Sequence, residues 1–187
     1  MKNLSTTQQY FLCVLKKNGK ISSLEMEKTT CLAASAIVEL LMDNILTLDG
    51  KKLSVQAPLP EDKSYLRQVY YVVMKKQPVK FESVMEYFSF NFTDKYMDGL
   101  IEDIGESLVN LGCVQKEKGG FMNGKTLYIP NADDVDHIVQ NIRAELLEEG
   151  EISEDIVVLT ALLNKSGDLQ RYFSSYEKQA LKKRLEE

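Results

Sequence analysis

The sequence predicts a mainly α-helical fold, a single-domain bundle over residues 1–187 with about eight helices and two short β-hairpins. Three observations lead to this prediction. Apolar residues recur at helical spacing through most of the chain. In two segments the pattern changes to the alternation of β-strands around a glycine-containing turn. The length also suits one substantial hydrophobic core, because chains of this size commonly form one domain.

Segment 29–55 organises the rest of the prediction. Its first half is apolar at helical spacing, and no Lys or Arg occurs between Thr29 and Gly50. A surface helix would carry charge on its outer face, so this helix is expected to lie in the interior. Its second half alternates about Asp49-Gly50, a dipeptide that suits the positive φ angles of a tight hairpin turn. We therefore expect a buried central helix that leads directly into a two-stranded hairpin.

The remaining helices are predicted from apolar spacing and from residues that begin or end helices. Ser5 or Thr6 is the expected N-cap of the first helix, and Pro78 is expected to end the helix before it. The last helix ends in KKRLEE, and the run 156–163 is apolar all round and is expected to be buried. In chain order, the other predicted helices cover 6–17, 65–76, 80–90, 94–111, 131–148 and a segment capped by Ser153.

The residue types needed for most catalytic or metal sites are scarce. Cys13, Cys31 and Cys113 are widely spaced among apolar neighbours, which is typical of buried free thiols. His137 is the single histidine and is expected to be a solvated surface residue. The sequence has no glycine-rich phosphate loop and no nucleophile elbow. We therefore predict that the protein is not an enzyme and needs no cofactor or metal.

Charge and hydropathy place the chain in an aqueous compartment. The net charge of −5 opposes nucleic-acid binding as a general property. No apolar run is long enough to span a bilayer, and the N-terminus lacks the features of a signal peptide. The protein is predicted to be cytoplasmic.

Three colinear stretches carry a family resemblance. They are LAASAIVELLMDNILTLDGKKLSV, SLVNLGCV and IVQNIRAELLEEGEISEDIVVLTALL. In this pattern the chain resembles the Golgi phosphoprotein three family over roughly residues 5 to 187. The resemblance implies a mostly helical fold with a protruding hairpin. It also implies an adaptor role without catalysis, with peripheral attachment to membranes through phosphatidylinositol 4-phosphate.

The headgroup pocket that the resemblance implies is not kept in this sequence. In the family it uses one tryptophan and three arginines, which offer bidentate donors beside an aromatic wall. The corresponding positions here are Leu24, Ala33, Asp98 and Ile101, and the chain contains no tryptophan. The resemblance therefore implies lipid binding while the residues for that particular headgroup are missing.

The second predicted hairpin is the candidate site. Its arms are 113–116 and 125–129, and its tip, 119–124, carries two large apolar side chains between lysines. Apolar side chains fringed by lysine suit an anionic lipid surface. We expect the tip to contact anionic headgroups of a membrane or to join copies into a homo-oligomer, although it can also fold back onto the body. The residues concerned are Lys116, Lys118, Phe121, Met122 and Lys125.

A winged-helix DNA-binding regulator is the alternative function, because its element order of helices followed by a hairpin is similar. The recognition helix would be 29–43 or 94–111. The first has acidic residues and no basic one, and the second has five acidic residues against Lys95. Both surfaces repel the phosphate backbone, which supplies most non-specific DNA affinity. We therefore expect no nucleic-acid partner.

Overall fold

The computed structural model describes residues 2–19, 21, 25–89, 95–119, 126–147 and 150–186. Within these ranges the chain is mainly helical with short antiparallel strands, which confirms the predicted fold class. In the first half the elements are α1 Thr6–Val14, α2 Met26–Met42, β1 Leu46–Asp49, β2 Lys52–Val55, the 3-10 helix η1 Glu61–Leu66, α3 Arg67–Lys76, β3 Val79–Lys80, α4 Phe81–Ser89 and α5 Lys95–Asn110. The second half contains β4 Val114–Lys118, β5 Thr126–Pro130, α6 Ala132–Leu147, α7 Glu154–Lys165, α8 Leu169–Tyr172 and α9 Ser175–Glu186.

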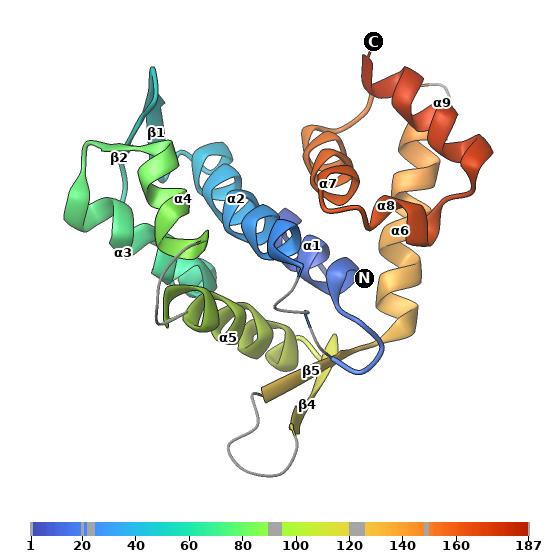
Figure 1. Ribbon diagram of the computed structural model, residues 1–187, viewed down its shortest axis with the longest axis horizontal. Coiled ribbons are helices and arrows are strands. Elements are labelled where there is room, and N and C mark those ends of the chain that lie inside the picture. Colours follow the sequence, from blue (N-terminus) through green and yellow to red (C-terminus); the bar gives the residue numbers. More distant parts are fainter. Residues whose placement is uncertain are drawn as a thin grey trace.

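Helix α2 is the central element, as the sequence predicts. It packs against α1, α3, α4, α5 and α7, and its core side chains are fully buried. Helices α6 to α9 lie on one side of α1 and α2, and α3 to α5 lie on the other (Figure 1). The helix begins at Met26, three residues before the predicted start. The buried Lys28 fits within it because its ammonium group pairs with Asp168, a contact that local pattern does not reveal.

The first sheet contains one strand more than the sequence predicts. Strands β1 and β2 pair as expected around Gly50, which has a φ of 58°. The two-residue strand β3 joins the other side of β2, with Leu53 opposite Val79. The Phe81 amide at the start of α4 donates to the Lys51 carbonyl oxygen over 2.9 Å. Lys80 therefore ends a strand instead of beginning a helix, because it pairs with Lys52 of β2, which is far from it in the sequence.

The C-terminal helices differ from the prediction in two respects. Ile156, Leu159 and Leu163 of α7 are buried, but Val157 is 39% exposed on the opposite face. The expectation that the whole run 156–163 is buried is therefore wrong, because α7 packs mainly along α1 and α2. The single last helix of the prediction consists of α8 and α9, separated at Phe173 and Ser174.

Glu39 of α2 joins three segments through its buried carboxylate. It accepts hydrogen bonds from the Thr7 amide (3.1 Å), the Lys63 ammonium group (2.8 Å) and the Tyr65 hydroxyl (2.5 Å). Burial alone raises the pKa of Glu39, but these hydrogen bonds outweigh it, so the pKa lies below its ordinary value. The ionised carboxylate thus connects α2 to the start of α1 and to η1.

This low pKa makes a specific pH dependence expected. Because the pKa of Glu39 is lower in the folded chain, its ionised form stabilises the fold above the ordinary glutamate pKa of about 4.3. That contribution disappears as the pH falls through the folded-state pKa. The difference in free energy of unfolding between wild type and Glu39→Gln, measured with urea, should be largest near neutral pH and shrink in acid. A difference independent of pH would contradict this role.

Candidate interaction hairpin

The β4–β5 hairpin is fixed to the body of the protein by Tyr128. This side chain is only 2% exposed, and its ring meets the Phe11 ring edge-on, with 6.2 Å between centroids. Its hydroxyl donates to the Glu106 carboxylate of α5 over 2.9 Å. Burial and the neighbouring Glu106 carboxylate raise the pKa of Tyr128, so the hydroxyl remains a donor. The base of the hairpin is therefore held by an apolar contact and a charged hydrogen bond together.

Two glycines make room for this anchor. A Cβ atom on Gly105 of α5 would lie 2.3 Å from Tyr128 Cζ, far inside van der Waals contact. A Cβ atom on Gly19 would lie 2.9 Å from the Tyr128 backbone, and Gly19 has a φ of 74°. The Gly19 carbonyl oxygen also accepts a hydrogen bond from the Tyr128 amide (3.3 Å). The chain before α2 and the middle of α5 thus hold Tyr128 between them.

The register assigns the lysines of β4 to one face of the hairpin. Lys116 is opposite Tyr128 and Lys118 is opposite Thr126, so these four side chains share the face turned toward α5. The Lys116 ammonium group lies 2.5 Å from the Glu106 carboxylate and lowers the pKa of Glu106. Lys116 is therefore paired within the protein although it is exposed, and Lys118 is exposed as well. The basic character of the described hairpin is weaker than its sequence indicates.

The structure describes only two of the five predicted site residues. Lys116 and Lys118 lie on β4, which confirms the predicted hairpin and extends its first arm by two residues. Phe121, Met122 and Lys125 lie outside the described residues. The role of the tip therefore stays a prediction.

The positions that correspond to the family's headgroup pocket provide no basic side chain. Ala33 is fully buried in α2, Asp98 is exposed on α5, and Ile101 of α5 is half-buried against the core. Leu24 lies outside the described residues. None of these three described positions carries a guanidinium group that could bind a phosphate.

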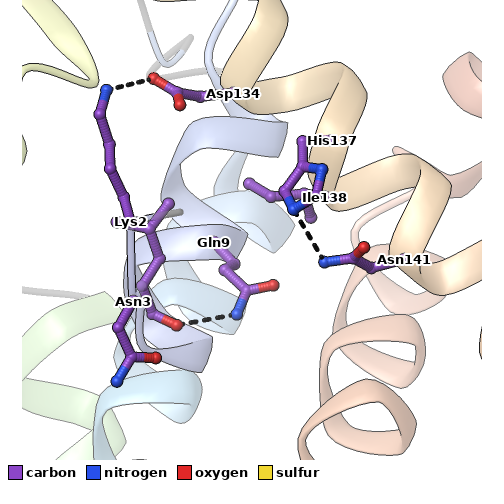
Figure 2. A pocket seen from close by; sticks show the side chains of 8 residues that line it. Lys2, Asn3, Gln9, Asp134, His137, Ile138 and Asn141 are labelled. Atoms are coloured by element: carbon purple, nitrogen blue, oxygen red, sulfur yellow. Dashed lines mark hydrogen bonds and ion pairs between the residues drawn. The ribbon is translucent and has the colours of Figure 1, made fainter.

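A pocket of about 550 Å³ lies between the N-terminal segment and α6. Figure 2 shows Lys2 reaching Asp134, and His137 beside Asn141. The Lys2 ammonium group is occupied, because it also donates to the Gly112 carbonyl oxygen (2.8 Å). His137 is exposed, as the sequence predicts. These groups satisfy one another and do not form a nucleophile, base and anion-binding site.

All three cysteines lie among the described residues as buried free thiols, as predicted. In the same ranges, no three His, Cys, Asp or Glu side chains are arranged to hold a metal ion. No helix of the described segments is both long and apolar enough to cross a bilayer.

The residues that position the hairpin are not among the predicted site residues. The sequence pattern places Tyr128 only in a strand, and Gly105 and Glu106 only in a helix. A glycine inside an apolar helical pattern often marks a close approach of another segment, so Gly105 indicates that a second segment packs against this helix. The partner of that glycine cannot be deduced from the sequence, because Tyr128 follows it by 23 residues.

The fold and hairpin together define a mainly helical protein that presents a firmly anchored β-hairpin. Residues 7–187 match the family described as Golgi phosphoprotein 3 (GPP34), and the chain belongs to this family. No curated protein matches the chain in sequence. Family membership supports a Golgi phosphoprotein-like adaptor role in general, and the family is not known as enzymatic. Neither the match nor the acidic surface of α5 supports the DNA-binding alternative.

Proposed function

We propose that this protein is a non-catalytic, peripheral membrane adaptor that contacts anionic lipid surfaces through the β4–β5 hairpin. The observation that carries the proposal is the anchoring of Tyr128 between α5 and the segment before α2. An anchored base lowers the entropy cost of presenting the tip to a partner. Lys118, exposed near the outer end of β4, adds positive charge beside that tip.

The expected affinity of one hairpin is low. Burying Phe121 and Met122 contributes about 1.5–3 kcal/mol each, and a lysine at an anionic surface about 1 kcal/mol. After losses from partial insertion and ordering, about 4 kcal/mol remains, which corresponds to roughly millimolar affinity. We therefore propose that several hairpins act together on a homo-oligomer, where a second contact follows the first at high effective concentration.

General negative charge, rather than one headgroup, is the proposed recognition feature. The described pocket positions are Ala33, Asp98 and Ile101, and none donates to a phosphate as arginine does. Vesicles with phosphatidylinositol 4-phosphate should therefore bind no better than phosphatidylserine vesicles of equal surface charge. A clear preference for the phosphoinositide at equal charge would contradict this part of the proposal.

The test replaces the two apolar side chains of the tip. Phe121→Asp with Met122→Asp should lower co-sedimentation with anionic vesicles or the oligomer size measured by light scattering, while the melting temperature remains nearly unchanged. The neutral variant Phe121→Ser with Met122→Ser controls for added charge and should also bind less. A large fall in melting temperature would instead assign both side chains to the core. Unchanged binding and oligomer size would contradict the proposed function.

A further inference from the structure

Five lysines lie in or next to the β1–β3 sheet, far from the β4–β5 hairpin: one in the β1–β2 turn, one each on β2 and β3, and two at the end of α3. All five are exposed, and none forms a salt bridge with another described residue. In Figure 1 the β1–β2 hairpin and the β4–β5 hairpin lie at opposite ends of the part formed by α2 to α5. We call this surface the lysine end; it consists of Lys51, Lys52, Lys75, Lys76 and Lys80.

The sheet register brings Lys52 and Lys80 together. They are direct partners across β2 and β3, so their side chains leave the same face as neighbours. The adjacent row, Leu53 with Val79, is buried, so the lysine row faces outward. Lys51 is held beside them, because its carbonyl oxygen accepts the Phe81 amide proton. Like charges directly opposite each other destabilise a sheet, and an anionic partner would reverse this effect.

Helix α3 brings the other two lysines beside the same sheet. Lys75 and Lys76 form its last turn, and the next residue, Gln77, accepts the Val55 amide of β2 over 2.7 Å. Lys80 follows Lys76 by four positions, so their Cα atoms are at most about 14 Å apart. The acidic side chains closest in the chain are Asp49, opposite Lys52, and Glu82 in the first turn of α4. Positive charge therefore remains in excess.

Two exposed apolar side chains lie near these charges. Leu48, beside the β1–β2 turn, is 48% exposed; it lies in the row of the buried Leu53, on the face of the sheet opposite to Lys52 and Lys80. Met74, which precedes Lys75 in α3, is also exposed. Lysine ammonium groups are mobile point charges without the planar fork of arginine, so they suit diffuse negative charge better than one fixed acidic group. Apolar side chains among mobile cations suit the headgroup region of a bilayer.

We propose that the lysine end is a second membrane-contact surface, which binds the headgroup region of an anionic bilayer independently of the β4–β5 hairpin. The protein is acidic overall, with a net charge of −5, so an isolated basic surface determines which of its sides approaches such a bilayer. Binding through it depends on surface charge and weakens with salt.

The test measures binding to phosphatidylserine vesicles in the Phe121→Asp, Met122→Asp background, which removes the apolar tip. Salt-sensitive binding should persist there. Adding Lys75→Gln with Lys76→Gln should lower the apparent affinity by about 25-fold, because each lysine near an anionic surface raises the affinity by about fivefold. The matched control, Lys165→Gln with Lys183→Gln, changes the net charge equally at exposed sites on α7 and α9. It should change the affinity less than about threefold.

A second variant separates binding from folding. Lys80→Gln removes the like-charge pair with Lys52 and leaves the Asp49–Lys52 pair in place, so it should weaken vesicle binding without lowering the melting temperature. Equal losses in the α3 variant and its control, or no loss in either, would overturn the proposal. Binding to poly-glutamate without binding to vesicles would also overturn it, in favour of an acidic polypeptide. If the tip variant alone binds like wild type, the hairpin function fails and the lysine end is unaffected.

Discussion

Replacing Asp168 by alanine is expected to lower the free energy of unfolding by about 3–5 kcal/mol. Its carboxylate has no solvent exposure and accepts hydrogen bonds from Lys28 (2.9 Å), Arg171 (2.8 Å) and the Ser166 hydroxyl (3.0 Å). Lys28 is itself buried, so Asp168→Ala removes its buried partner and leaves only the more exposed Glu25 beside the charge. Chemical denaturation at neutral pH measures the loss.

A matched variant shows whether burial causes this effect. Glu25 contacts the same Lys28 ammonium group at 3.3 Å, but its side chain is 35% exposed. Glu25→Ala should therefore cost less than about 1 kcal/mol. Adding Lys28→Met to Asp168→Ala should recover part of the stability, because the buried charge is removed. Equal losses for Asp168→Ala and Glu25→Ala would contradict the assignment of a buried ion pair that joins α2 to the α7–α8 connection.

The Gly105→Ala variant is expected to lose about 3 kcal/mol of stability, although alanine favours a helix by about 1 kcal/mol over glycine. The new Cβ atom would overlap the Tyr128 ring, whose Cζ lies 2.3 Å from that position. Moving the ring breaks the hydrogen bond to Glu106, a charged acceptor worth about 1.5–3 kcal/mol. Amide exchange in β4 and β5 should become faster, because the hairpin loses its anchor.

A double-mutant cycle distinguishes the clash from a general effect on α5. Leucine at position 128 lacks the outer ring atoms that meet the Gly105 Cβ position. In the Tyr128→Leu background, Gly105→Ala should therefore be neutral or stabilising by up to about 1 kcal/mol. A similar destabilisation in both backgrounds would contradict the proposed contact between residues 105 and 128.

The helices could be predicted because their signals are local. The Ser5 side chain accepts the Gln8 amide in a capping box, as the start of α1 required. Periodicity predicts that α1 ends at residue 17, but the helix ends at Val14. The Arg171 guanidinium binds the carbonyl oxygens of Cys13 and Leu15, so a residue of α8 completes this end of the helix. The apolar periodicity of residues 6–17 cannot reveal a contact with Arg171, which is far away in the sequence.

The same distinction explains what was missed in the candidate sites. The β4–β5 hairpin is visible in the sequence as two alternating arms, but the pairing of Lys116 with Glu106 depends on how the hairpin lies against α5. Lys51-Lys52 and Lys75-Lys76 look like ordinary solvated ends of elements when they are considered separately. The pairing of β3 with β2 places Lys80 opposite Lys52 and connects the chain after α3 to the sheet, and a two-residue strand leaves no periodic pattern.

The central claim, that the hairpin tip contacts an anionic membrane, is tested most directly by a fluorescent probe at the tip. Because Cys13, Cys31 and Cys113 are buried, Met122→Cys can be labelled selectively in the folded protein with an environment-sensitive dye. Lys183→Cys on α9 provides an exposed control position. On mixing with phosphatidylserine vesicles, the dye at position 122 should shift to shorter wavelength while the dye at 183 does not. Co-sedimentation without any shift at position 122 would contradict the claim.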